Sequence, residues 1–374
     1  MNNIITFILS LRFLISVLAI LLVTNIFLST RRLDRLNDHR KQDMELRKEQ
    51  LKKDVYPPMK PFIIKDCTNL WNAKTQSRYI LSDDTNEMER LYPRETNITI
   101  PKFHWDNVVI LMLIHNNDDV TNLLQSHFDT WISSMPKELD ILFVTDKSDN
   151  RTYHQIFPNA KNVLPTIHLY KSAAANNDGK KVKLKMIDSL KYIYAKFKNW
   201  NKKLQIVKID TDTFIIPENL IKTLQDIHNK TYPYPTNFGR IDCQTYYGYN
   251  RCYTVGGSYG ISKVGIGAFL QYYDNPNCYD CKRPILRKHN PMTDEDYFMS
   301  LTYQNATCLP SVHVSGMSIR LYKREYYFHG PEENEWDTTN RHITIHLVKS
   351  SIDFAMLQKF YYFDNGTLRD EYRL

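Results

Sequence analysis

The sequence predicts an α/β fold in which a mixed sheet is flanked by helices, behind an N-terminal transmembrane helix and a stem. Two observations support it: strand and helix patterns alternate after residue 106, and a long apolar run near the N-terminus precedes a charged segment. The 374 residues are 42% hydrophobic with 11 Gly and 16 Pro, which excludes a disordered or collagen-like chain. We therefore expect an anchor at 1–30, a stem at 31–100 and a folded domain at 101–374.

The apolar run extends from Ile4 to Leu28 and is interrupted by Arg12. At about 1.5 Å per residue it is long enough to cross a bilayer core of roughly 30 Å. A cleaved signal peptide is the alternative, but the run ends without a clear small-x-small cleavage motif. Arg31 and Arg32 follow it, and charge counting alone would leave the body of the chain in the cytosol.

The glycosylation sequons and the cysteines favour a lumenal orientation of the body of the chain. Five Asn-x-Ser/Thr sequons suit a lumenal chain, although asparagine is abundant enough for several to arise by chance. The six cysteines all follow the apolar run, and an even number is compatible with disulfides whose pairing stays open. Cys278-x-x-Cys281 could belong to a zinc site or a redox pair, but it has no second such pair and no thioredoxin-like context, which favours a structural disulfide. The sequons are Asn97, Asn150, Asn229, Asn305 and Asn365, and the remaining cysteines are Cys67, Cys243, Cys252 and Cys308.

The net charge of +8 does not indicate a nucleic-acid partner. Half of the excess comes from Arg12 and residues 31–54, and the rest is too scattered to form a basic face. The glycine-rich motifs of dinucleotide-dependent dehydrogenases and of P-loop NTPases are also missing.

The folded part begins with strand, helix, strand, helix, strand. Asn107–Ile114, Asp140–Asp146 and Lys203–Ile209 predict strands, and the first is an apolar run typical of a strand buried on both faces. Asp118 starts a helix toward Trp131, and Lys181–Phe197 has helical spacing. Ligands in such sheets bind beyond the carboxyl ends of the strands.

Two carboxylates, Asp210 and Asp212, follow the third strand. Side chains one residue apart in a turn can both reach one hard divalent cation, and such a cation can hold a diphosphate and neutralise it as it leaves. The bare Asp-x-Asp pattern is weak and occurs in surface loops. Its position between Ile209 and Phe214, each in an apolar segment, favours metal binding.

Residues 185–220 contain a helix, a buried strand, Asp-Thr-Asp and then Thr-Phe-Ile-Ile-Pro-Glu-Asn-Leu. This order resembles the core of the β-1,3-glycosyltransferases of the fringe and core 1 galactosyltransferase group, and the resemblance covers about residues 106–350. Further matching segments appear in the family's order. They are Asp129–Ile132, Phe143–Asp146, Phe238–Arg240, Tyr253–Ser262 and Thr293–Tyr297.

The resemblance implies a GT-A-type nucleotide-sugar-binding domain in a single-pass type II Golgi membrane protein with a lumenal catalytic domain. It implies a UDP-sugar donor, manganese, and inverting β-1,3 transfer of a hexose to an O-linked glycan of a glycoprotein, with galactose transfer to O-GalNAc (core 1) as the main hypothesis. The implied site residues are Asp146, Lys185 and Asp210 for the nucleotide-sugar, Asp210, Asp212 and His346 for the metal, and Asp296 as the catalytic base.

The late segment 341–348 alternates like a strand and would place His342, Thr344 and His346 on one face. His346 matches the family's histidine that completes the metal site, and imidazole is an acceptable ligand for manganese. Without the resemblance, a core histidine is the better interpretation.

Asp296 is chosen as the base by its match to the family. Asp294, Glu295 and Asp296 crowd one loop, and mutual repulsion can raise the pKa of one of them. The alternative is a helix N-terminus, where acidic residues favour the helix dipole.

Two departures from the family pattern concern the site. Thr211 stands where the family usually has the middle of three aspartates. The glycine segment reads Gly-Gly-Ser-Tyr-Gly, which leaves the shape of the acceptor pocket open. Gly256 and Gly257 form either a turn or bulge, or a place where a sugar approaches the backbone closely.

Alternative functions stay open at this point. One is fringe-like transfer of GlcNAc from UDP-GlcNAc to O-linked fucose, and another is a non-catalytic lumenal chaperone, although the aspartates argue against it. A sugar-binding module is a third, although its tyrosines more often pack in a core. The expected partners are the donor, the glycoprotein acceptor and the membrane, with a homodimer left open. The tyrosines are Tyr246, Tyr247, Tyr249 and Tyr253.

Overall fold

The structure is a computed structural model that describes residues 79–82, 85–93, 98–114, 118–158, 163–173, 182–197, 200–246, 249–275, 295–320 and 342–374. The chain divides into Met1–Pro58 and Met59–Leu374, and every described residue belongs to the second unit. The expected anchor, Ile4–Leu28, lies outside the described residues. Among the residues that are described, no helix combines the length and the apolar character needed to cross a membrane.

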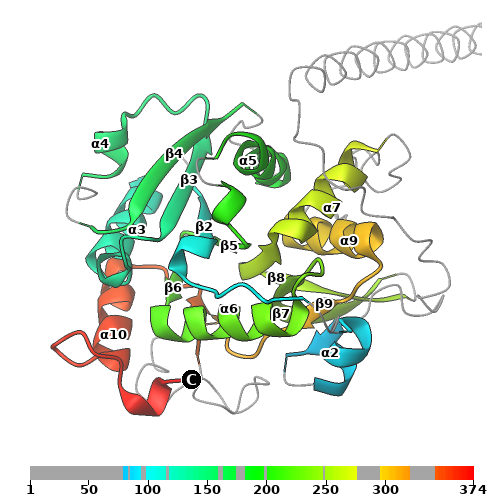
Figure 1. Ribbon diagram of the computed structural model, residues 1–374. Helices are drawn as coiled ribbons and strands as arrows, with labels where there is room; N and C mark the ends of the chain where they lie inside the picture. Colours follow the sequence, from blue (N-terminus) through cyan, green and yellow to red (C-terminus); the bar gives the residue numbers. More distant parts are fainter. Residues whose placement is uncertain are drawn as a thin grey trace, which may run out of the picture. The chain divides into compact units, whose positions relative to one another are not determined.

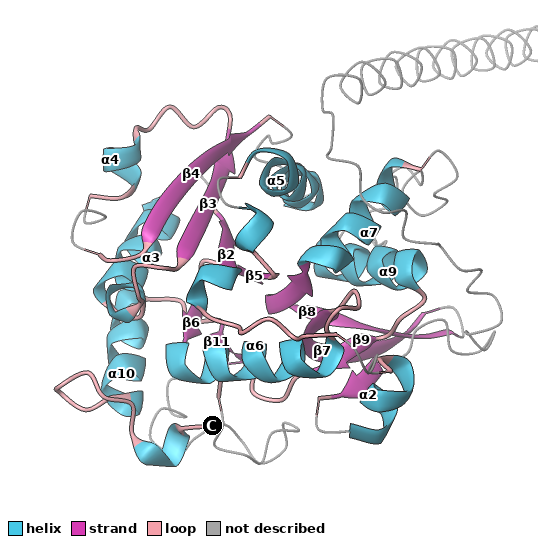
Figure 2. Ribbon diagram, viewed as in Figure 1, coloured by secondary structure: helices cyan, strands magenta, loops and turns pink. Residues whose placement is uncertain are grey.

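The framework is an eight-stranded mixed sheet with the strand order β1-β9-β7-β8-β5-β2-β3-β4 (Figures 1 and 2). Strands β5, β2, β3 and β4 are parallel to one another, whereas β8 runs antiparallel to both β5 and β7. The strands are β1 (Tyr79–Leu81), β2 (Val108–Leu113), β3 (Asp140–Asp146), β4 (Thr166–Ser172), β5 (Gln205–Ile209), β7 (Asn237–Tyr246), β8 (Tyr249–Ser262) and β9 (Ser311–His313).

A second, three-stranded sheet has the order β10-β11-β6, with β6 at Thr213–Ile215, β10 at Ile319–Arg320 and β11 at Thr344–His346. It joins two segments that are far apart in the sequence. Its strand β6 follows β5 after a short turn, and β11 lies near the C-terminus. The helices are α2 (Thr85–Leu91), α3 (Asp118–Asp129), α4 (Tyr153–Ile156), α5 (Val182–Lys196), α6 (Pro217–Thr231), α7 (Lys263–Asp274), α9 (Glu295–Thr307) and α10 (Ser351–Tyr361).

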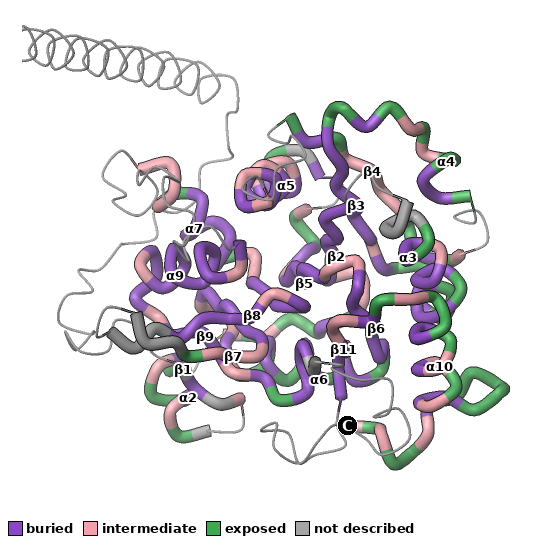
Figure 3. The backbone as a smooth tube through the Cα atoms, turned by 180° about the vertical axis from the view of Figure 1, so that it is seen from behind, coloured by how far each residue is buried: buried purple, intermediate pink, exposed green. Residues whose placement is uncertain are grey.

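Helices cover the central strands of the large sheet on both faces. On β2, Val108, Ile110 and Met112 belong to one hydrophobic core together with residues of α3, α6 and α10. The residues between them are also fully buried, on the side of α5. The smooth tube in Figure 3 is accordingly buried along β2, β3 and β5. Burial on both faces explains the continuous apolar run of β2 and the apolar middle of β3.

The predicted mixed α/β sheet flanked by helices is confirmed. The strands expected at Asn107–Ile114 and Asp140–Asp146 are β2 and β3, and the helix expected at Lys181–Phe197 is α5. The strand expected to start at Lys203 begins at Gln205, because the N–H of Lys203 closes the preceding 3-10 turn with a bond to Trp200 O at 3.1 Å.

The folded sheet extends into the range expected to be stem. Strand β1 pairs in parallel with β9 at the edge of the large sheet, and Ser82 continues this pairing with a backbone hydrogen bond to His313 O at 2.7 Å. In α2, Met88 is buried, and so is Tyr92 directly after it. Residues 79–82 and 85–93 are therefore part of the domain's sheet and core.

Cysteines in the described part are disulfide-bonded. Cys243 and Cys252 lie directly opposite each other on β7 and β8 and form a disulfide. Cys308, just after α9, is also disulfide-bonded. The expectation of disulfides is confirmed for these three cysteines, while Cys67, Cys278 and Cys281 lie outside the described residues.

A first prediction concerns the N-terminal border of the domain. We expect a chain that starts at Lys102 to be less stable than one that starts at Met59, by at least about 2 kcal/mol, because it loses the β1–β9 pairing and the buried side chains of Met88 and Tyr92. Urea unfolding followed by circular dichroism measures the difference. Equal unfolding midpoints for the two chains would show that residues 59–101 are a stem after all.

Candidate metal centre

The Asp-x-Asp turn lies between β5 and β6, beyond the carboxyl end of a parallel strand, as the sequence predicted. The backbone N–H of Asp210 donates to Gly257 O on β8 at 3.0 Å, and the N–H of Thr213 donates to Asp210 O at 3.2 Å. The chain therefore leaves the pleat of the sheet at Asp210, and Asp212 comes round to the same side. This turn brings the two carboxylates together.

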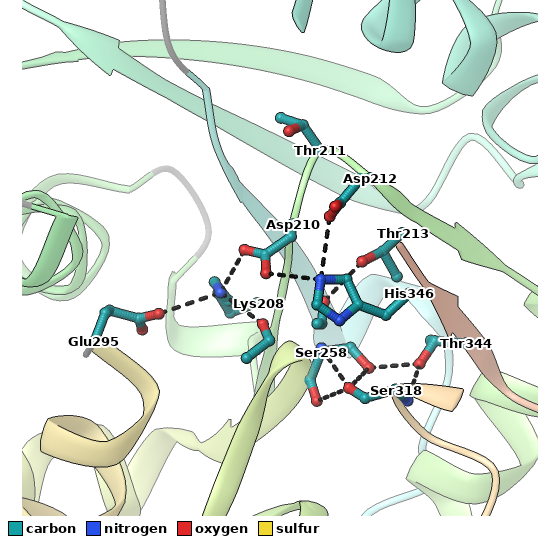
Figure 4. Close-up of polar contacts among 12 residues, drawn as sticks. Lys208, Asp210, Thr211, Asp212, Thr213, Ser258, Glu295, Ser318, Thr344 and His346 are labelled. Atoms are coloured by element: carbon teal, nitrogen blue, oxygen red, sulfur yellow. Dashed lines mark hydrogen bonds and ion pairs between the residues drawn. The ribbon is translucent and has the colours of Figure 1, made fainter. Parts of the chain in front are cut away.

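His346 reaches this turn through the small sheet. Strand β11 pairs antiparallel with β6, and His346 lies opposite Thr213, the residue after Asp212. The N–H of Val348 continues the contact with a bond to Asp212 O at 2.9 Å. The three predicted ligands therefore come from two segments that are more than 130 positions apart in the sequence, and they converge at one point (Figure 4).

The geometry of this triad suits a metal ion. One ligand atom each from Asp210, Asp212 and His346 lies within 4.8 Å of the others, and no second such group occurs in the part of the chain that is described. His346 Nε2 lies 3.2 Å from Asp212 Oδ1 and 3.6 Å from Asp210 Oδ2. Two carboxylate oxygens and one imidazole nitrogen form a ligand set for a divalent cation, with coordination positions left for a ligand or water.

His127 on α3 supports the turn from behind. The indole N–H of Trp131 donates to His127 Nδ1 at 2.7 Å, so Nε2 carries the proton and donates to the backbone oxygen of Thr211 at 2.8 Å. Burial lowers the pKa of His127 to about 4, so the ring is neutral at physiological pH. Thr211 thus contributes its backbone carbonyl, and its side chain points away from the triad (Figure 4).

Asp212 has a cationic neighbour on its other side. Its Oδ2 accepts a hydrogen bond from the ammonium of Lys349, whose side chain is 65% exposed. Burial alone would raise the pKa of Asp212, but hydrogen bonds and charge from His346 and Lys349 outweigh it and lower the pKa to about 2. Asp212 is therefore ionised and able to bind a cation at neutral pH.

Asp210 has a buried cationic neighbour. Lys208, 3% exposed, donates to Asp210 Oδ1 at 2.6 Å and to Gly256 O at 2.8 Å, and its ammonium lies 3.2 Å from Glu295 Oε2. Burial alone would lower the pKa of Lys208, but the charges of Asp210 and Glu295 raise it. Lys208 occupies Oδ1 of Asp210, which leaves Oδ2 facing His346.

Glu295 is the first residue of α9, so the helix N-terminus considered for this acidic segment is correct. Its carboxylate is buried and accepts a hydrogen bond from the hydroxyl of Tyr259. Burial raises the pKa of Glu295, against the charge of Lys208, and Asp210 adds to the increase. One acid of the segment does have a raised pKa, with burial as its main cause. Asp294 lies outside the described residues.

Asp296 approaches the triad beside Gly256. A Cβ added to Gly256 would lie 3.0 Å from Asp296 Oδ2 and 3.8 Å from Asp210 Oδ2, so both carboxylates flank this glycine. The other oxygen of Asp296 accepts a hydrogen bond from the N–H of Tyr297 at 2.8 Å. The carboxylate is thus held by its own helix start, with Oδ2 on the side of the metal ligands.

Gly256 and Gly257 lie in a bulge of β8, where Val255–Ser258 stand opposite the single residue Arg240. The bulge interpretation is therefore confirmed, and the reason for glycine at Gly257 is the histidine. A Cβ there would lie 2.4 Å from His346 Cγ, a distance that no real contact shows. The imidazole packs directly on the glycine backbone.

A buried hydroxyl network fixes β11 beneath this bulge. Ser258 Oγ lies 2.5 Å from Thr344 Oγ1, which also accepts the N–H of Ser318 at 2.7 Å. The N–H of Ser258 in turn donates to Ser318 Oγ at 2.6 Å. Thr344 and His346 therefore both face β8, as the predicted strand pattern requires.

His342 does not share that face, so this part of the strand prediction is wrong. It precedes β11, is buried, and its Nδ1 lies 2.5 Å from the hydroxyl of Tyr361 on α10. The strand is shorter than expected because Leu347, with φ of +69°, turns the chain immediately after His346.

Asp146 and Lys185, expected at the nucleotide, are brought together as a buried ion pair with Nζ 2.6 Å from Oδ1. Lys185 also donates to Ile114 O at 3.0 Å, so the pair lies at the carboxyl ends of β2 and β3. This is the same edge of the sheet as Asp210, two strands away. Both side chains are only 2% exposed.

Several site residues were missed or left open by the sequence. Lys208 interrupts the apolar segment Ile206–Ile209 two positions before Asp210, and a lysine buried in this way requires an acidic partner, which is a usable signal. Lys349 and His127 carry no comparable signal.

Tyr253 packs against Tyr297 in the core, with ring centroids 4.8 Å apart, while the side chains of the other three tyrosines lie outside the description.

No protein-family model and no curated protein matches this chain.

The contact of Gly257 with His346 yields a second prediction. Gly257→Ala should displace the imidazole and weaken Mn²⁺ binding about 10- to 100-fold, because one ligand is misplaced. Electron paramagnetic resonance of free Mn²⁺ measures the affinity without any substrate. In the His346→Ala background, adding Gly257→Ala should weaken the metal no further.

Gly256→Ala is the matched control, since its new methyl group would meet the carboxylate of Asp296 rather than the ring of His346. It should leave Mn²⁺ affinity close to that of the wild type. If Gly257→Ala binds Mn²⁺ as tightly as Gly256→Ala does, then His346 is not a metal ligand.

Proposed function

We propose that this protein is a metal-dependent, inverting β-1,3-glycosyltransferase with a GT-A-type domain that transfers a hexose from a UDP-sugar to an O-linked glycan. Galactose transfer to O-GalNAc is the main candidate. The observation that carries the proposal is the convergence of Asp210, Asp212 and His346 beyond the end of β5, with the carboxylate of Asp296 next to Asp210 beside Gly256. A metal site and a separate carboxylate close to it are the parts that such a transfer needs.

The donor would bind at the triad. Asp210, Asp212 and His346 would hold the divalent cation, proposed to be Mn²⁺, which neutralises charge on the diphosphate of the leaving UDP. Lys208 binds Oδ1 of Asp210 and so leaves Oδ2 directed at the metal position. The hydrogen bond from His127 to Thr211 O keeps the turn in place. Asp146 and Lys185 are the candidates for shaping the nucleoside end of the site, because they lie at the same edge of the sheet.

Asp296 is the proposed base. In an inverting transfer the acceptor hydroxyl attacks the anomeric carbon from the side opposite the leaving diphosphate, so the base must face the metal site across the sugar. Asp296 Oδ2 lies near Asp210 Oδ2 beside Gly256, and the bond from Tyr297 N–H orients the carboxylate, which supports Asp296 in this role. Glu295 is unsuitable, because Lys208 and Tyr259 already engage it.

The disulfides support the lumenal location that goes with this proposal. Cys243–Cys252 and the bonded Cys308 are typical of an oxidising compartment, such as the lumen of the secretory pathway. A type II Golgi membrane protein anchored by residues 1–30 accounts for both the disulfides and the apolar N-terminal run.

A panel of UDP-sugars tests the proposed function. We expect residues 59–374 to hydrolyse or transfer the sugar of one UDP-sugar in the presence of Mn²⁺ and to lose this activity with a chelator. Product with UDP-galactose and an O-GalNAc peptide supports the core 1 activity, whereas product only with UDP-GlcNAc and an O-fucose acceptor supports the fringe-like alternative. No turnover and no Mn²⁺-dependent UDP binding would point to a non-catalytic binding protein.

A further prediction separates the base from the metal site. Asp296→Asn removes the proton acceptor and should lower the transfer rate at least about 100-fold, while UDP affinity with Mn²⁺ stays within about twofold. Product formation and calorimetric UDP titration measure the two effects. Near-normal turnover of Asp296→Asn would show that a neighbouring acid is the base instead.

A further inference from the structure

Lys349 lies directly beside the metal ligand Asp212. Its ammonium contacts Asp212 Oδ2, while Oδ1 of the same carboxylate faces His346. The two oxygens of Asp212 thus have different neighbours, the candidate metal position on one side and a lysine on the other.

The two lysines at the site differ in how firmly they are held. Lys208 is 3% exposed and donates to Asp210 and Gly256, so its ammonium is committed to the interior. Lys349 is 65% exposed and approaches from the solvent side. Its backbone, however, is fixed on both sides: Val348 N–H donates to Asp212 O, and Ser350 is the N-cap of α10.

The balance of charges at the metal site indicates a function for Lys349. A divalent cation compensates the charges of Asp210 and Asp212, so a bound diphosphate brings negative charge that the triad does not compensate. The same cation shares the charge of Asp212 and weakens its attraction for Lys349. An ammonium beside Asp212 then lies within reach of the oxygens of a diphosphate held at the neighbouring position.

We propose that Lys349 is a donor-binding residue that leaves Asp212 when the metal and nucleotide bind and then contacts the diphosphate of a nucleoside diphosphate. This inference rests on the proposed function, because it takes the triad to be the diphosphate site. It assigns two opposing effects to one side chain. In the absence of nucleotide the ammonium competes with the metal for Asp212, and in its presence the ammonium strengthens binding of the anion.

The opposing effects define the experiment. In Lys349→Ala, UDP affinity at saturating Mn²⁺ should fall about tenfold, the loss expected for one charge-assisted hydrogen bond at an exposed position. Mn²⁺ affinity without nucleotide should stay equal or increase. Isothermal calorimetry with UDP and paramagnetic resonance of free Mn²⁺ measure these affinities. Lys349→Arg keeps the charge and should restore most of the UDP affinity.

Lys359→Ala is the matched control, because Lys359 is an exposed lysine on the adjacent helix α10 and should change neither affinity. A loss of both Mn²⁺ and UDP affinity in Lys349→Ala would reveal a structural role and overturn the inference. Wild-type affinity for UDP in Lys349→Ala overturns the inference alone. No UDP binding by the wild-type protein overturns the proposed function, and the inference with it.

Discussion

The site depends on the antiparallel pairing of β6 with β11. This short ladder sets His346 opposite Thr213 and thereby next to the Asp-x-Asp turn, although the two segments are far apart in the sequence. Neither strand has more than three residues, so the ladder alone is weak. Its register is fixed by contacts with neighbouring segments. Thr344 hydrogen-bonds to Ser258 and Ser318, which also bond to each other, and His346 packs on Gly257. The bulge in β8 is what makes room for this packing.

The acidic residues of the site lie around one buried lysine, Lys208. Lys208 lies between Asp210 and Glu295, and each of these carboxylates would be costly to bury without it. The arrangement also separates the functions of the acids. Lys208 and Tyr259 engage Glu295 in the interior, whereas Asp296, one residue further along α9, directs an oxygen toward Gly256. Adjacent acids in the sequence thus reach different environments because successive residues of a helix point in different directions.

Sequence reasoning worked best where burial leaves a strong pattern. Strands β2 and β3 and helix α5 were found nearly to the residue, since their apolar runs and helical spacing reflect packing on both faces of the sheet. Strand β4 was missed because it lies at the edge of the sheet, where partial exposure allows a mixture of polar and apolar residues. Asp210 and Asp212 could be found from their position after a strand, but His346 could be found only through the resemblance. Lys349 and His127 act through contacts between distant segments, which no local pattern encodes.

The Asp-x-Asp turn shows why a threonine can stand between the two aspartates. The turn is held by backbone groups: Asp210 N–H donates to Gly257 O, Thr211 O accepts from His127, and Asp212 O accepts from Val348 N–H. None of these bonds uses the side chain of the middle residue. The neutral His127, with its proton fixed on Nε2 by Trp131, is the donor that the middle carbonyl requires. The constraint on this part of the site is therefore a set of backbone hydrogen bonds, and the middle side chain, directed away from the triad, is open to substitution.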